Sequence, residues 1–176
     1  MTDPTKAALL EAALRYASAG HVVFPGHSVN GDGHCSCGRS KCGSPAKHPR
    51  IREWQKHATT DDTAIRRWWS RWPSANVCLA TGRKSGLIVV DVDPRHDGEA
   101  SLAALSETHC EFSETPTVRT GGGGLHFFFQ CPDQGIPNRV GILPGIDIRG
   151  DGGFVVAPPS LHISRQVYQW IRPLTA

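Results

Sequence analysis

The chain has 176 residues, of which 39% are hydrophobic and 20% are charged, so its composition is that of a globular protein and excludes a disordered one. No apolar run approaches the ~20 residues of a membrane span, and the N-terminus has no secretory signal, so we expect a cytoplasmic protein without a membrane partner. The length predicts one domain over residues 1–176. The net charge of +3 is uneven, because residues 39–72 hold nine basic and three acidic residues, which suits a polyanion or makes a solvated face.

Hydrophobic periodicity predicts the α+β class with a largely antiparallel sheet. Apolar residues at helical spacing predict helices over residues 5–19, 60–72 and 98–107. Runs rich in β-branched and aromatic residues predict strands over residues 21–25, 76–80, 87–93, 117–120, 125–130, 145–150, 154–157 and 167–171. The tryptophans of the second helix recur at core spacing from Ile65, so we interpret them as core residues and not as a base-stacking platform.

Residues 26–49 form an irregular segment that is too long for an unsupported loop in a compact domain. Three of the six cysteines lie here, and without a secretory signal they indicate metal binding and not disulfides. Three thiolates and one imidazole make a standard tetrahedral zinc set, for which the candidates are Cys35, Cys37, Cys42 and His48. His27 and His34 compete for the histidine position. Because four protein ligands leave no open position, we predict a structural Zn²⁺ that stabilises the loop.

The strand over residues 87–93 ends in two aspartates, Asp91 and Asp93, before Pro94 stops it. Side chains alternate along a strand, so both carboxylates are expected on one face. Two such charges repel each other unless a positive group lies between them, and carboxylate oxygens suit Mg²⁺ or Mn²⁺. The alternative is an Asp-rich turn at a strand end without a ligand.

A third carboxylate, Asp147, lies in the strand over residues 145–150. There Ile146 and Ile148 face one side, while Asp147 and Arg149 face the other. A polar face on an otherwise apolar strand is expected where that face forms part of an active site. Together with the aspartate pair, Asp147 completes what a two-metal nucleotidyl-transfer site needs, in which one ion activates a 3′-hydroxyl and the other neutralises a triphosphate. This interpretation requires the strands to be adjacent.

Four glycines at residues 121–124 separate two predicted strands and indicate a hairpin. Glycine lets a backbone approach a ligand closely and offers N–H groups to anions, although a simple flexible turn is the alternative. From the expected sheet geometry, the predicted triphosphate ligands are Arg119, Thr120, Gly121, His126 and Arg149. The chain has no Walker A sequence and no G-x-G-x-x-G that opens a helix, which disfavours a P-loop or Rossmann enzyme.

The order of these motifs resembles the archaeo-eukaryotic primase superfamily, and above all the N-terminal domain of the bifunctional DNA primase/polymerases (prim-pol) of phage and plasmid replication proteins. The motifs that carry the resemblance are Asp-x-Asp at 91–93, Gly-Gly-x-His at 123–126 and an apolar residue with Asp at 146–147. Further similar stretches are Cys-Ser-Cys-Gly at 35–38 with Cys42, Lys-His-Pro at 47–49, Ser-Gly-Leu at 85–87 and Pro-Pro-Ser-Leu-His at 158–162. The resemblance extends from about residue 21 to residue 170.

The resemblance implies an RRM-like catalytic sheet completed by an N-terminal αβ part, and template-directed synthesis of primers and DNA from (d)NTPs in a bacterial host cell. Motif position makes three residues metal ligands: Asp91, Asp93 and Asp147. It makes His126 a catalytic nucleotide contact, and His162 is expected to reach the phosphates. Such domains usually precede a helicase, and the chain stops at Ala176, so we expect it to be excised from a longer replication protein.

Two functions from other classes stay open. The irregular segment of residues 26–49, called the Cys/His loop below, and the basic residues 39–72 fit a non-catalytic, zinc-containing nucleic-acid-binding module. The same carboxylates fit a metal nuclease, which would degrade DNA without added triphosphate.

Overall fold

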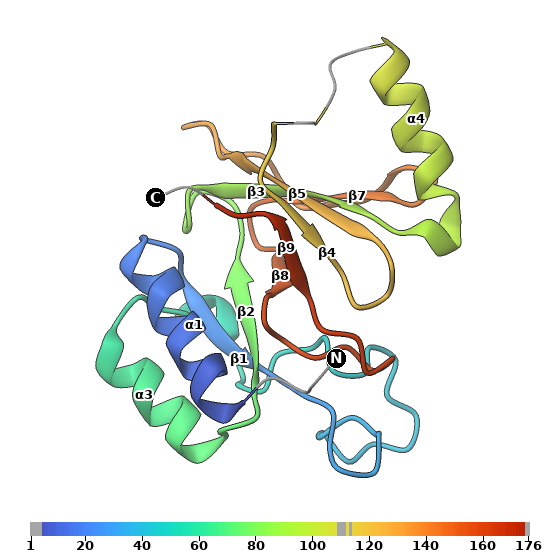
Figure 1. The fold of residues 1–176 in the computed structure, drawn as a ribbon. Helices are drawn as coiled ribbons and strands as arrows, with labels where there is room; N and C mark the ends of the chain where they lie inside the picture. Colours follow the sequence, from blue (N-terminus) through green and yellow to red (C-terminus); the bar gives the residue numbers. More distant parts are fainter. Residues whose placement is uncertain (1–4, 109–111, 113, 175–176) are drawn as a thin grey trace.

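The computed structural model describes residues 5–108, 112 and 114–174 (Figure 1). Its helices are α1 (Lys6–Ser18), α2 (Trp54–His57), α3 (Asp62–Arg71) and α4 (Gly98–Thr108), with a 3-10 turn η1 (Pro94–His96). Its strands are β1 (Val23–Gly26), β2 (Asn76–Ala80), β3 (Leu87–Val92), β4 (Thr117–Arg119), β5 (Leu125–Gln130), β6 (Arg139–Leu143), β7 (Ile146–Arg149), β8 (Phe154–Ala157) and β9 (Gln169–Arg172). Neighbouring strands of both described sheets pair antiparallel, so the predicted α+β class is confirmed.

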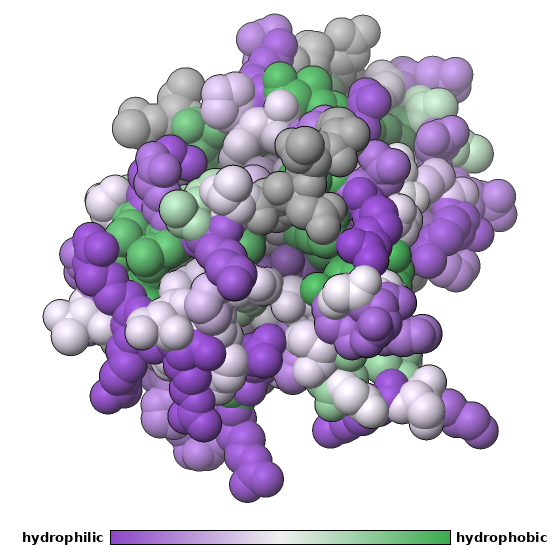
Figure 2. Space-filling model, turned by 60° about the horizontal axis from the view of Figure 1, so that its bottom comes forward, coloured by the Kyte–Doolittle hydropathy of each residue, from purple (hydrophilic) through white to green (hydrophobic). Residues whose placement is uncertain are grey.

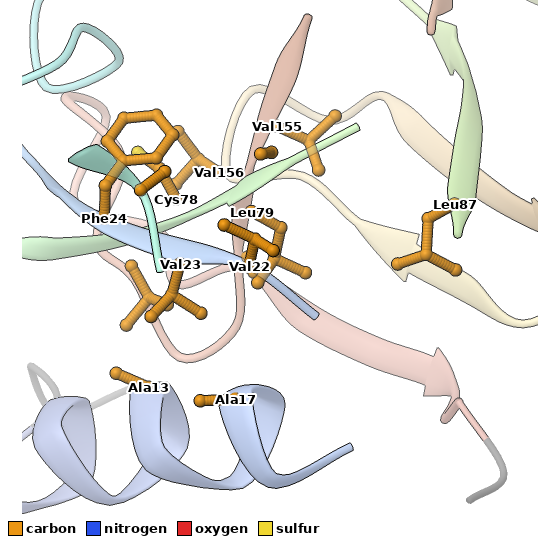
Figure 3. Close-up of a cluster of buried hydrophobic side chains, with 14 of the residues drawn as sticks. Ala13, Ala17, Val22, Val23, Phe24, Cys78, Leu79, Leu87, Val155 and Val156 are labelled. Atoms are coloured by element: carbon orange, nitrogen blue, oxygen red, sulfur yellow. The ribbon is translucent and has the colours of Figure 1, made fainter. Parts of the chain in front are cut away.

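A small three-stranded sheet, in the order β1-β2-β8, packs against α1 and α3 (Figure 1). Small side chains on α1 allow the helix to lie close to the sheet, and Figure 3 shows Ala13 and Ala17 facing Val23 at the start of β1 and Val22 just before it. On α3, Ile65 and Trp69 are buried, and the Trp69 indole N–H donates to the carbonyl of Ala75. Trp68 and Trp72 are partly buried and pack against the same core, so the prediction that the tryptophans of this helix are core residues is confirmed.

A six-stranded sheet, in the order β6-β7-β3-β5-β4-β9, carries α4 on one of its faces (Figure 1). Val92, Phe127 and Ile146 point to this face and form a second core cluster with Leu102 and Leu105 of the helix. The period of two along each strand sends the neighbouring side chains to the opposite face. One sheet therefore has an α4 face and a face turned toward the small sheet.

The face turned toward the small sheet changes character along β3. Leu87 and Val89 are buried in the main core, together with Phe128 of β5 and residues of β1, β2 and β8. Two residues further along the same face, Asp91 follows, and His126 lies opposite it on β5. The apolar half of this face joins the two sheets, while its polar half is left for a site.

Three elements that the sequence did not indicate are the single-turn helix α2, the 3-10 turn η1 and the strand β6. All five residues of β6 are exposed, so the strand lacks the alternation of buried and exposed residues by which strands are recognised. It is an edge strand, paired only with β7 among the described strands. The other strands match their predicted positions closely, and the largest shifts are at β1 and β9.

The surface seen in Figure 2 is mainly hydrophilic, with smaller hydrophobic areas between the polar side chains. The large exposed hydrophobic side chains are Val140, Ile142, Leu143 and Ile171, which lie on the two edge strands β6 and β9. None of the described helices has the length and apolar character needed to cross a membrane.

The core of the small sheet offers a test of the fold. Leu79 on the central strand β2 is completely buried (Figure 3), so Leu79→Ala removes apolar contacts and leaves a cavity. We expect a loss of about 2–5 kcal/mol in the free energy of unfolding, measured by urea denaturation. The matched control, Arg66→Ala, removes only an exposed ion pair with Asp62 and should change stability by less than about 1 kcal/mol. Equal losses in the two variants would contradict this packing.

Candidate active site

The central strand β3 brings together side chains from three strands. Asp91 lies directly opposite Asp147 of β7 and directly opposite His126 of β5. Directly opposed residues of antiparallel strands point to the same face of the sheet, so the three side chains converge. The structure thus provides the adjacency of strands that the predicted three-carboxylate site requires.

A guanidinium group lies between the two opposed carboxylates. Arg149 donates to Asp91 Oδ2 from Nε at 3.1 Å and from Nη2 at 2.9 Å, and its Nη2 also donates to Asp147 Oδ2 at 2.7 Å. The backbone N–H of Gly141 binds the other oxygen of Asp147 at 2.7 Å. Two like charges are therefore held side by side because a positive group bridges them.

The electrostatic surroundings keep two of the acids ionised. Burial alone raises the pKa of Asp91, but His126 and Arg149 outweigh it and hold the pKa below its ordinary value. Hydrogen bonds from Arg95 lower the pKa of Asp93 to about 2. Asp93 also accepts the backbone N–H of Arg95 at 3.0 Å and so caps η1. Both groups are carboxylates at neutral pH, which is the form that binds cations.

His126 is held within the sheet face. Its Nε2 lies 3.4 Å from Asp91 Oδ1, and its ring lies near those of Phe128 and Tyr168. Its Nδ1 is buried and has no hydrogen-bond partner among the described residues. The polar contact of the ring is therefore made through Nε2, toward the carboxylates.

The turn formed by the four glycines at residues 121–124, called the glycine turn below, packs tightly against the neighbouring segments of the chain. Thr120 closes it, because the Thr120 N–H donates to the carbonyl of Gly124 and the Gly124 N–H donates to Thr120 Oγ1. A Cβ atom on Gly121 would lie 2.2 Å from Cβ of His162, and one on Gly124 would lie 2.2 Å from the carbonyl oxygen of Val92. Here glycine serves close packing, and the Gly124 N–H is used within the turn instead of being offered to an anion.

His162 is fixed by contacts to this turn. Its Nδ1 accepts the backbone N–H of Ser164 at 3.2 Å, and the Ser164 hydroxyl donates to the carbonyl of Gly121 at 2.6 Å. Burial, with the positive charges of Lys47 and Arg95, lowers the pKa of His162 to about 4. Nδ1 also lies 2.9 Å from the Ser164 hydroxyl oxygen. The ring is neutral at pH 7, so one of its nitrogens is a donor and the other is an acceptor.

These side chains line a cleft of about 1200 Å³ between the six-stranded sheet, the Cys/His loop and the segment that follows β8. The predicted site residues that line it are Asp91, Asp93, Thr120, His126, Asp147, Arg149 and His162. Most of the site expected from the sequence is thus collected in one cavity.

Two residues predicted to bind the nucleotide lie elsewhere. Arg119 pairs with Leu125, whereas its neighbour Val118 pairs with His126, so the Arg119 side chain points to the α4 face and is exposed. Gly121 is buried against the segment that carries His162 and does not line the cleft. The expectation for Arg119 is corrected by the register of β4 and β5, which the sequence does not reveal.

Two cationic residues of the cleft were missed in the sequence. Lys47 precedes the zinc-ligand candidate His48 in the loop, and Arg95 follows Asp93 by two residues. The short spacing to Asp93 is a signal that could have identified Arg95. Lys47 belongs to the Lys-His-Pro stretch at 47–49 that resembles the prim-pol family, and this stretch is the signal that could have identified it.

The basic surplus of residues 39–72 does not form one binding surface around the cleft. Within this fully described segment, Lys47 is the one Lys or Arg that lines the cavity. Others are used locally, such as Arg66, which pairs with Asp62 on the exposed side of α3. The interpretation as a solvated face therefore holds for most of the segment.

The Cys/His loop brings four candidate zinc ligands together: Cys35, Cys37, Cys42 and His48, whose ligand atoms all lie within 4.8 Å of one another. His48 Nε2 lies 3.4 Å from the sulfur of Cys35 and 3.5 Å from that of Cys42. Tetrahedral zinc with ordinary bond lengths separates a nitrogen from a sulfur ligand by roughly 3.5 Å. The cluster can therefore hold zinc.

The competing histidines have other positions. His27 stacks on His48 with 4.3 Å between ring centroids, and its Nδ1 lies 3.0 Å from the Ser36 hydroxyl, so it packs beside the cluster without joining it. His34 is exposed and outside the cluster. His48 is thus the histidine of the set.

Comparison with known families gives a match to Prim-Pol, described as "Bifunctional DNA primase/polymerase, N-terminal", over residues 13–176. Among curated proteins, no match was found. Because the family match covers nearly the whole chain, the chain belongs to the Prim-Pol family. Membership confirms the resemblance found in the sequence and supports DNA primase/polymerase activity in general, with DNA and nucleotides as substrates.

The zinc cluster can be tested by metal content. We expect about one zinc ion per purified chain, lost in Cys37→Ser with a decrease in Tm of about 5 °C or more. The control, Cys131→Ser, changes a half-buried thiol outside the cluster and should keep its zinc. Elemental analysis and thermal melting measure both effects. Equal zinc contents in the two variants would argue against this ligand set.

The low pKa of His162 predicts an acid-sensitive fold. Its folded value of about 4 lies below the ordinary 6.5, so the unfolded chain binds more protons between these values and stability falls as the pH decreases from 6.5 to 4. His162→Gln removes this contribution, and its Tm should fall less over that interval. The exposed His57→Gln is the control and should follow the wild type. A wild-type slope in His162→Gln would refute the assignment.

Proposed function

We propose, with membership in the Prim-Pol family as the premise, that this chain extends primers on a DNA template from (d)NTPs and does so by a two-metal mechanism in phage or plasmid replication. The observation that supports it best is the register of β3, which sets Asp91 opposite Asp147 and beside His126 in one cleft. Three carboxylates with adjacent cationic groups are the donor set for metal-assisted nucleotidyl transfer.

The carboxylates fit hard divalent cations. Asp91, Asp93 and Asp147 offer oxygen ligands in one cavity, and we assign them to Mg²⁺ or Mn²⁺. Bound there, the cations would lower the pKa of the primer 3′-hydroxyl and neutralise the triphosphate. In the reaction the 3′-hydroxyl gives its proton to solvent and its oxygen bonds to the α-phosphorus. The bond between that phosphorus and the oxygen that bridges to the β-phosphorus breaks, and pyrophosphate leaves with the bridging oxygen.

The remaining residues of the cleft position the substrate. Arg149 keeps two repelling carboxylates together and carries a guanidinium that suits phosphate oxygens. His162 offers its imidazole ring, and Thr120 lines the same cavity. His126 holds Asp91 through Nε2. Phosphoryl transfer depends mainly on positioning and charge, and each of these groups contributes one or both.

The proposal is tested by primer extension. With primed template, dNTPs and Mn²⁺ or Mg²⁺, the wild type should extend the primer, and Asp147→Asn should lose at least about 100-fold in rate while circular dichroism shows an intact fold. Asp133→Asn, which changes an exposed acid outside the cleft, is the control and should be fully active.

Three outcomes would overturn the proposal. The first is a wild type that extends no primer, and the second is an Asp147→Asn variant as active as the wild type. The third is DNA degradation without added triphosphate, which would indicate a nuclease that uses the same carboxylates. A helicase region in a longer replication protein is the partner that this function leads us to propose.

A further inference from the structure

The wall of the cleft formed by the Cys/His loop contributes one charged side chain, Lys47. Across the cavity its ammonium group interacts electrostatically with Asp91, Asp93, Arg95 and Arg149. Among the described residues that line the cleft, three carboxylates and three Lys or Arg side chains therefore face one another. Their formal charges cancel, so two divalent cations would leave a surplus of positive charge that matches a triphosphate.

The backbone on both sides of Lys47 is fixed. Ala46 is 1% exposed and has a left-handed φ of 59°, and its N–H donates to the sulfur of Cys35 at 3.3 Å. The residue that follows Lys47 is His48, a member of the candidate zinc set. The Lys47 N–H itself donates to the carbonyl of Ser44 at 3.1 Å. The position of Lys47 thus depends directly on the geometry of the metal cluster.

One buried amide ties this loop to the segment that carries His162. Asn76, 1% exposed on β2, donates from Nδ2 to the carbonyls of Ala46 and Leu161, both at 2.9 Å. Its Oδ1 accepts the N–H of Leu161 at 3.0 Å. The residues immediately after these two anchors are Lys47 and His162. In Figure 1 the loop lies beside the segment between β8 and β9, in agreement with these contacts.

We propose that Lys47 binds the triphosphate of the incoming nucleotide, that Asn76 positions it beside His162, and that the metal held by the Cys/His loop thereby controls nucleotide affinity. The identity of the ligand rests on the proposed function. The shared chemistry is a phosphate anion, which the backbone of a DNA strand could also provide. A free triphosphate is favoured because Lys47 faces the carboxylates inside the cleft and not an open surface.

The first experiment compares Lys47→Ala with Lys41→Ala. Lys41 is an exposed lysine of the same loop outside the cleft, so both variants lose one positive charge at nearly the same place in the chain. Binding of dATP with Mn²⁺ is measured by calorimetry, and binding of primed template by fluorescence anisotropy. We expect Lys47→Ala to bind dATP about 10- to 100-fold more weakly, with template binding and zinc content unchanged, and Lys41→Ala to match the wild type.

The second experiment asks whether the metal cluster acts through Lys47. Cys37→Ser should weaken dATP binding in the chain that keeps Lys47 and have little further effect when Lys47→Ala is present, as a double-mutant cycle measures. Lys47→Arg, which keeps the charge, should retain most of the affinity. Circular dichroism and melting of each variant establish that the fold persists.

The outcomes separate this inference from the proposed function. If the wild type extends primers and Lys47→Ala keeps the wild-type dATP affinity and KM, the role of Lys47 is refuted and the polymerase function stands. If Lys47→Ala weakens template binding and leaves dATP binding unchanged, the ligand is the DNA backbone and the inference fails. If the wild type binds dATP through Lys47 but extends no primer, the proposed function fails and the phosphate site stands.

Discussion

The register of β3 with its two neighbours is the constraint on which the site depends. A slip of one residue in either pairing would send the opposed side chain to the α4 face, because side chains alternate with a period of two. The pairing is held by the apolar half of the same strand, where Val89 and Phe128 are directly opposite each other in the core. The hydrophobic residues that join the two sheets thus also set the partners of Asp91.

The second constraint is the balance of charge in the cleft. The carboxylates of Asp91 and Asp147 share one guanidinium, and Asp93 has Arg95. Each carboxylate therefore has a guanidinium partner in the absence of a metal ion. A divalent cation that binds here competes with arginine for the same carboxylate oxygens. Because arginine has a high affinity for phosphate as well, the groups that neutralise the acids are suited to a second role beside a bound triphosphate.

Much of the fold and site was predictable because it is encoded locally. Helical spacing identified α1 and α3, and the alternation of Ile146 and Asp147 correctly indicated which face of β7 is polar. Arg119 and Lys47 could not be predicted in this way. The face of Arg119 depends on how the glycine turn sets the register of two strands, and Lys47 reaches the cleft through an amide 30 residues away from Ala46. Both depend on tertiary contacts.

The buried amide of Asn76 also has a consequence for how the molecule is made. Its partners are the backbone of Ala46 and that of Leu161, the latter 85 residues further along the chain. A nascent chain on the ribosome carries Asp91 and Asp93 well before β8 and Leu161 emerge, whereas Asp147 comes shortly before them. Until β8 is made, β2 lacks its neighbour on that side. The carboxylates are therefore synthesised before the residues that close the cavity around them. The cavity forms only when the last strands pair with earlier ones, and this pairing requires the loop-closure entropy of bringing distant parts of the chain together.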